Sequence, residues 1–108
     1  MTTISTERGV ATLINVFTAA PENQQRVVDA LAEAAAMKTV HGYVSSNVHK
    51  SLDGTRVANY VQWESAGDFE AMLENPGAAA PHMREAARIA ERYEPVLYEV
   101  SFVDEVAG

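Results

Sequence analysis

The pattern of hydrophobic and polar positions in the first third of the chain is first that of a buried strand and then that of an amphipathic helix. Residues 10–18 are apolar and β-branched and lie between Gly9 and Pro21, which predicts a buried strand. Pro21 suits a first helical turn, and apolar residues then recur at helical spacing to about Lys38. A strand followed by an amphipathic helix is therefore expected here.

The middle of the chain has the pattern of an antiparallel hairpin. Gly42 breaks the helix, and residues 43–50 and 56–63 both have strand character. Between them lies Asp53-Gly54, a strong hairpin signal, because glycine adopts positive φ without strain and aspartate tolerates it. The two strands should therefore be neighbours in one sheet.

The second strand of this hairpin carries chemically rich residues on both faces. Side chains alternate along a strand, so Asn59 shares a face with Trp63, the only tryptophan, while Tyr60 and Gln62 share the other. If the chain has a small-molecule site, Asn59 and Trp63 are its expected floor. The face with Tyr60 and Gln62 has to be covered by something else.

The last part of the chain predicts an interrupted helix and a final strand. Ser65 can cap a helix that ends at residues 75–77, Asn-Pro-Gly. Residues 78–92 are alanine-rich and helical, with Pro81 in the first turn, and residues 96–103 read as a strand. The element order is then β-α-β-β-α-β.

This order is that of the split-βαβ, ferredoxin-like α+β fold, a four-stranded antiparallel sheet with helices on one face. We expect a single domain at residues 10–104, after a flexible tail at residues 1–9. The face without helices would be formed by Ile14, Val16, Ala58, Tyr60 and Gln62. A mixed apolar face of this size is normally hidden by self-association, which favours a symmetric homodimer packed sheet on sheet.

Composition narrows the function. The chain has 108 residues, of which 47% are apolar and 21% charged, and no apolar run approaches the ~20 residues that cross a bilayer. The net charge of −7 argues against nucleic acid, whose binding rests on Lys and Arg. The absence of cysteine excludes thiolate chemistry, and with a polar start it favours a cytoplasmic protein. A neutral or aromatic small molecule is the better partner.

Residues 52–65 contain Leu-Asp-Gly-Thr and then Val-Ala-Asn-Tyr-Val-Gln-Trp-Glu-Ser, which closely resembles the antibiotic biosynthesis monooxygenase family of dimeric α+β barrels. Within that family, the segment is most similar to actinomycete polyketide anthrone monooxygenases. The resemblance implies a homodimer that oxidises a polycyclic aromatic phenol or anthrone to a quinone with O2. It also implies that no metal, haem or flavin is needed.

The resemblance also implies roles for particular residues. Asn59 and Trp63 match the pair credited with holding the substrate and activating oxygen, and Arg84 aligns with a functional arginine of the family. A carboxamide at 59 could donate hydrogen bonds to a developing oxyanion, and the indole would add a flat wall with one N–H donor. Phe69 stands where the anthrone enzymes have tyrosine, so no phenolic relay is available from that position.

Further residues are expected to line the substrate pocket. They are Asn15, Phe17, Phe69, Met72, His82 and Met83. The sequence is also compatible with two other functions. The loss of the hydroxyl at Phe69 also fits a dimeric binding or accessory protein for aromatic polyketides that performs no oxidation. Asn15 and His82 match positions used by the haem-degrading branch of the fold, although Met72 stands where that branch has tryptophan.

Overall fold

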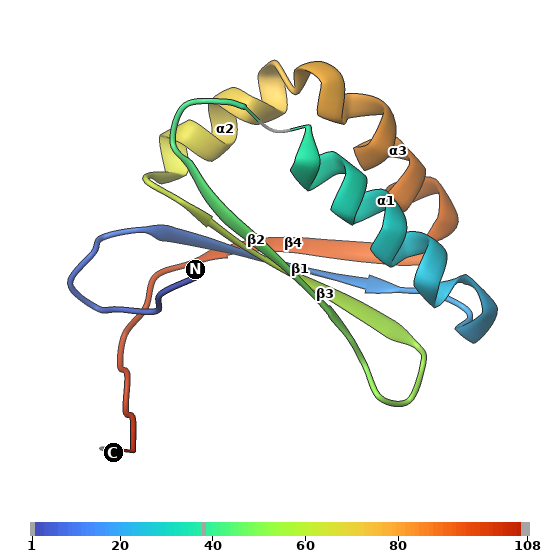
Figure 1. Cartoon of the computed structure of the whole chain (residues 1–108), viewed down its shortest axis with the longest axis horizontal. Coiled ribbons are helices and arrows are strands. Elements are labelled where there is room, and N and C mark those ends of the chain that lie inside the picture. The colour runs from blue at the N-terminus through green and yellow to red at the C-terminus, as the bar shows by residue number, and fades with distance from the viewer. Residues whose placement is uncertain (1, 38, 107–108) are drawn as a thin grey trace.

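The computed structural model describes residues 2–37 and 39–106, which form a four-stranded antiparallel sheet with its helices on one side (Figure 1). The elements in chain order are β1 (Ala11–Thr18), η1 (Pro21–Asn23), α1 (Gln24–Ala36), β2 (Tyr43–Lys50), β3 (Arg56–Trp63), α2 (Ala66–Glu74), η2 (Gly77–Ala79), α3 (Ala80–Ile89) and β4 (Arg92–Tyr98). The strand order β2-β3-β1-β4 confirms the predicted ferredoxin-like α+β fold. Lys38, the predicted helix end, lies outside the described residues.

Two boundaries near the C-terminus differ from the prediction. Helix α3 ends at Ile89 rather than near residue 92, and β4 spans Arg92–Tyr98 rather than residues 96–103. The pairing with β1 explains both differences, because β4 runs beside β1 from the Thr18–Arg92 pair to the Thr12–Tyr98 pair. The proline within β4 is tolerated because β4 is an edge strand.

The core lies between the sheet and the helices. One cluster of buried side chains joins β1, β3, α1 and α3 around Phe17, Val27 and Val57. A second joins β1 and β3 to α2 around Trp63, which is fully buried and packs between Tyr43 and Phe69 at ring-centroid distances of 5.5 and 5.9 Å. The indole is therefore held by two aromatic neighbours. Among the described helices, none is long and apolar enough to cross a membrane.

The hairpin between β2 and β3 is fastened to the first helix. The buried Gln24 side chain donates from Nε2 to the carbonyl oxygens of Ser51 and Arg56, both at 3.0 Å. Within the turn, Asp53 accepts hydrogen bonds from the Thr55 and Ser51 hydroxyls, which lower the pKa of its carboxyl to about 2. These contacts set the register of β3, and thus which of its residues face the helices.

The side of the sheet without helices is partly apolar, as predicted. Ile14, Val16, Ala58 and Tyr60 are half-buried there. Gln62 is fully buried instead, because its Nε2 donates to the Thr3 carbonyl oxygen at 2.7 Å and its Oε1 accepts from the Ser45 hydroxyl at 3.1 Å. The N-terminal segment therefore contacts one end of this face. Its flexibility in solution stays a prediction.

Replacing Gly42, which leads into β2, should destabilise the fold. Its φ is +83°, and a Cβ there would collide with the Asp68 side chain at the start of α2. Gly42→Ala should lower the free energy of unfolding by about 1–3 kcal/mol, since strain and collision add. Gly67→Ala is the matched control, because a Cβ there meets only the Ser65 hydroxyl at 3.7 Å. Urea unfolding with equal midpoints for the two variants would contradict this prediction.

Candidate active site

A cavity of about 630 Å³ is lined by residues of the sheet and of the three α-helices. This volume is within the range of ~300–1,000 Å³ that small-molecule sites occupy. The strands β1 and β3 contribute Leu13, Asn15, Phe17, Asn59 and Trp63, and the helices contribute Leu31, Ala34, Phe69, Met72, Leu73, Met83, Arg84 and Ala87. The edge strand β4 adds Tyr93, Pro95 and Leu97. Most of the lining is apolar, so the few polar groups decide how a ligand is oriented.

Two carboxamides and the indole form a polar floor. Asn15 of β1 lies directly opposite Asn59 of β3 in the sheet register, and Trp63 follows four residues later on the same face. The Oδ1 atoms of Asn15 and Asn59 and the Nε1 atom of Trp63 are buried and have no hydrogen-bond partner among the described residues. An unpartnered buried group costs ~1–3 kcal/mol. Three such atoms together on a cavity floor indicate a place where a ligand supplies the partners.

Arg84 supplies the cationic group of the lining. It lies on α3, and within the described part of the chain it makes no ion pair. The neighbouring Glu85 is instead held by Arg88, whose Nη2 and Nε lie 2.6 and 2.9 Å from the carboxylate and lower its pKa. Arg84 is thus a cationic lining residue that Glu85 does not neutralise.

Sequence comparison identifies the family. Residues 11–88, from β1 through nearly all of α3, match the family model described as antibiotic biosynthesis monooxygenase. The chain belongs to the antibiotic biosynthesis monooxygenase family. It is 39% identical over 103 residues to tetracenomycin-F1 monooxygenase of Streptomyces glaucescens, which covers 94% of this chain and 90% of that protein. The resemblance inferred from residues 52–65 is thus confirmed.

Solved structures agree on the fold. An anthrone oxidase-like protein is 27% identical with a TM-score of 0.76; the match covers 89% of this chain but only 41% of that longer chain. A monooxygenase from the gene ActVA-Orf6 of Streptomyces coelicolor, solved in complex with nanaomycin D, is 23% identical with a TM-score of 0.73. That match covers 92% of this chain and 93% of the other.

In this family member, most of the predicted site residues meet at one cavity. Those that line it are Asn15, Phe17, Asn59, Trp63, Phe69, Met72, Met83 and Arg84. Their chemical roles stay predictions. His82 does not line the cavity: its Nδ1 lies 3.0 Å from the Glu33 carboxylate on α1, so it joins the two helices instead. The hypothesis of haem degradation required His82 as a ligand in the cavity, and the position of His82 argues against it.

The lining residues of β4 were not among the site residues predicted from the sequence. Tyr93 and Pro95 were placed before the predicted start of the final strand, although Tyr93, Pro95 and Leu97 recur with the period of two that a strand requires. In the structure Tyr93 pairs with Phe17 across β1 and β4, and the two rings stack with centroids 5.8 Å apart. Residues 92–98 also lie beyond the segment that matches the family model.

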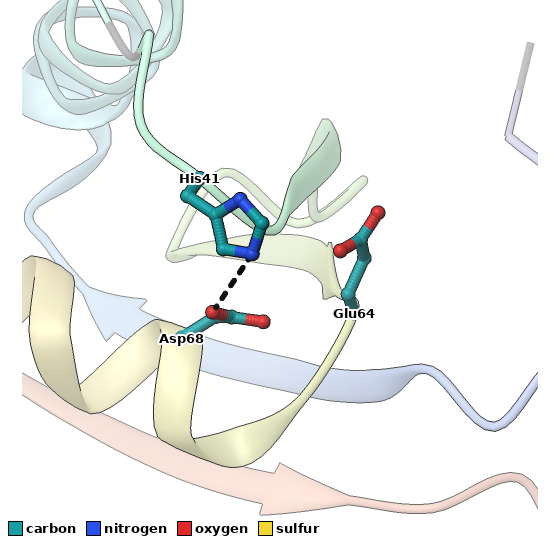
Figure 2. A group of neighbouring side chains, drawn as sticks. All are labelled: His41, Glu64 and Asp68. Atoms are coloured by element: carbon teal, nitrogen blue, oxygen red, sulfur yellow. Dashed lines mark ion pairs between the residues drawn. The ribbon is translucent and has the colours of Figure 1, made fainter.

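A second group of polar side chains lies outside the cavity, at the start of α2. The ligand atoms of His41, Glu64 and Asp68 come within 4.8 Å of one another, and His41 Nε2 is 3.8 Å from Asp68 Oδ1 (Figure 2). Asp68 also accepts a hydrogen bond from the Ser65 hydroxyl, which in turn caps the helix by accepting from the Asp68 amide. We interpret these contacts as fixing the start of the helix that follows Trp63.

Proposed function

We propose that this chain is a cofactor-independent monooxygenase that converts a polycyclic aromatic phenol or anthrone into a quinone with O2. The observation that carries the proposal is the unpartnered polar floor of Asn15, Asn59 and Trp63 beneath an otherwise apolar cavity. A flat aromatic molecule with hydroxyl and carbonyl groups on one edge complements such a site, because hydroxyls can donate to the two Oδ1 atoms and an oxygen can accept from the indole N–H. The 39% identity to a protein named tetracenomycin-F1 monooxygenase supports the same reaction class.

The floor suits the chemistry that this reaction requires. An aromatic substrate reacts with O2 once it is an electron-rich anion, so the protein has to stabilise a phenolate or enolate and exclude water. The Asn59 carboxamide can donate from Nδ2 to the developing oxyanion, a contribution of roughly 3–4 kcal/mol for an aimed donor, while its unpartnered Oδ1 accepts from a substrate hydroxyl. For an anthrone, the ring CH2 becomes C=O, one oxygen atom enters the product and the other leaves as water.

The composition of the lining supports oxidation without a metal cofactor. Among the described residues that surround the cavity there is no histidine, cysteine, aspartate or glutamate, the side chains that usually hold a catalytic metal. Arg84 would instead balance the charge of the bound anion, and the indole N–H of Trp63 would donate to reduced oxygen. The substrate itself would supply the electrons.

The proposal is tested with an oxygen electrode and metal-depleted protein. Anthrones, naphthols and quinols are incubated with the protein in air and under nitrogen, and the products are followed by absorbance and mass. We expect one quinone for each O2 consumed, in air only, and at a rate well above the spontaneous one. Tight binding of the same compounds without any rate enhancement would instead identify a non-catalytic binding protein.

We also propose that two copies pack through the sheet face that carries no helix. The register aligns Val96, Ile14 and Tyr60 in one row across β4, β1 and β3 on this face, and Val96 is 44% exposed. Such an apolar row on a sheet is a surface that a second copy can cover.

Val96→Asp should convert the dimer into a monomer, because the new carboxylate would be buried without a partner when two sheets pack. Leu52→Asp is the control, since Leu52 is fully exposed at the tip of the hairpin. Light scattering after gel filtration should give the dimer mass for the wild type and Leu52→Asp, and the monomer mass for Val96→Asp. A monomeric wild type would contradict the proposed dimer.

A further inference from the structure

This inference rests on the proposed oxidation, which requires a group that carries the substrate's proton out of the cavity. Forming the reactive anion breaks an O–H or C–H bond, and the proton has to reach water. Asparagine and tryptophan side chains do not act as bases near neutral pH, and arginine stays protonated. Among the described lining residues, these leave Tyr93 as the side chain with an exchangeable hydroxyl.

We propose that Tyr93 is a catalytic residue that transfers the substrate's proton from the cavity to solvent. Its position suits a relay, because it lines the cavity and is nevertheless 50% exposed, whereas its stacking partner Phe17 is 4% exposed. The stacked Phe17 ring, tilted by 30°, holds the phenol ring in place. Tyr93 therefore connects the apolar interior with water.

Other groups that could carry a proton are placed elsewhere. His82 faces Glu33 across two helices, and Phe69, which lines the cavity wall, has no hydroxyl. Tyr98 is on the same strand as Tyr93, five residues later, and so points to the opposite face of the sheet. It is equally exposed, at 50%, but does not line the cavity.

The proton transfer balances without any further reactant. The substrate's O–H or C–H bond breaks and its electron pair stays behind as the phenolate or enolate. The Tyr93 oxygen accepts this proton while its own hydroxyl proton passes to a water molecule, so the phenol is regenerated with no change of charge. The anion then remains on the asparagine floor for reaction with O2.

Hydrogen–deuterium exchange under nitrogen isolates this step from oxidation. Anthrone carries two exchangeable protons on its CH2 carbon, and their loss in D2O is followed by NMR. Wild-type protein should accelerate the exchange, and Tyr93→Phe should reduce this acceleration by about 100-fold, a typical loss for a general acid–base group. Tyr98→Phe should exchange at the wild-type rate. Anthrone affinity, measured by tryptophan fluorescence, should change little in either variant.

The outcomes separate this inference from the proposed function. If Tyr93→Phe exchanges the anthrone protons as fast as the wild type, the relay is wrong, whether or not the protein consumes oxygen. Exchange by the wild type without any oxygen consumption in air would contradict the oxidation and leave the relay standing. Tyr93→His restores a group that carries protons, and partial recovery of exchange would support the relay over a purely structural role. A wild type that accelerates neither reaction would overturn both proposals.

Discussion

Asn59→Ala should lower kcat for aerobic quinone formation by about 10²–10³-fold, the loss that follows removal of an aimed oxyanion donor. Asn59 is 7% exposed, and its carboxamide oxygen accepts no hydrogen bond from the described residues, so none accepted by that oxygen is lost in the variant. Folding should therefore be affected much less than turnover. Steady-state oxygen consumption together with thermal unfolding separates the two effects.

Asn47→Ala is the matched control for this variant. It removes the same carboxamide from the neighbouring strand β2, but Asn47 pairs with Tyr60 and so lies on the opposite face of the sheet. Its side chain donates to the Tyr60 carbonyl oxygen at 3.3 Å and accepts from Thr2, so the variant should lose stability and keep its turnover. Equal kcat values for Asn59→Ala and the wild type would remove Asn59 from the proposed chemistry.

Trp63→Phe should slow oxidation by at least about tenfold through loss of the Nε1 donor. The indole is fully buried, so the smaller ring also leaves a void that costs ~1–3 kcal/mol of stability. Because both effects arise from one change, turnover has to be measured well below the unfolding temperature. Single-turnover oxidation of bound anthrone gives the rate directly.

Tyr43→Phe serves as the control for the tryptophan variant. Tyr43 packs against the indole and is not among the residues that line the cavity. Its hydroxyl donates to Ser46, so the variant removes a nearby hydroxyl group without altering the cavity wall. If Trp63→Phe and Tyr43→Phe oxidise anthrone at the same rate, the indole N–H plays no part in the reaction.

The floor of the site could be predicted from sequence because strand geometry is strict. A period of two places Asn59 and Trp63 on one face whatever the rest of the chain does, and the amphipathic first helix shows that a covering layer exists. The pairing of Asn15 with Asn59 could not be predicted in the same way. It depends on the register between β1 and β3, which strand pattern alone does not give.

The helix α3 and strand β4 were harder to predict for two physical reasons. Small alanine side chains on α3 leave the angular position of its buried stripe ambiguous, so His82 could be placed toward the cavity although it contacts Glu33. A proline within a strand pattern argues against a strand, and this concealed the early start of β4. Tyr93, which the structure brings to the cavity, was missed for the second reason.

Oxidation of anthrone under ¹⁸O2 by metal-depleted protein tests the central proposal most directly. If the cavity supports cofactor-independent monooxygenation, the quinone gains one ¹⁸O atom per molecule, and its rate of formation falls sharply in Asn59→Ala but not in Asn47→Ala. A quinone formed at the spontaneous rate, or one whose new oxygen comes from water, would contradict it.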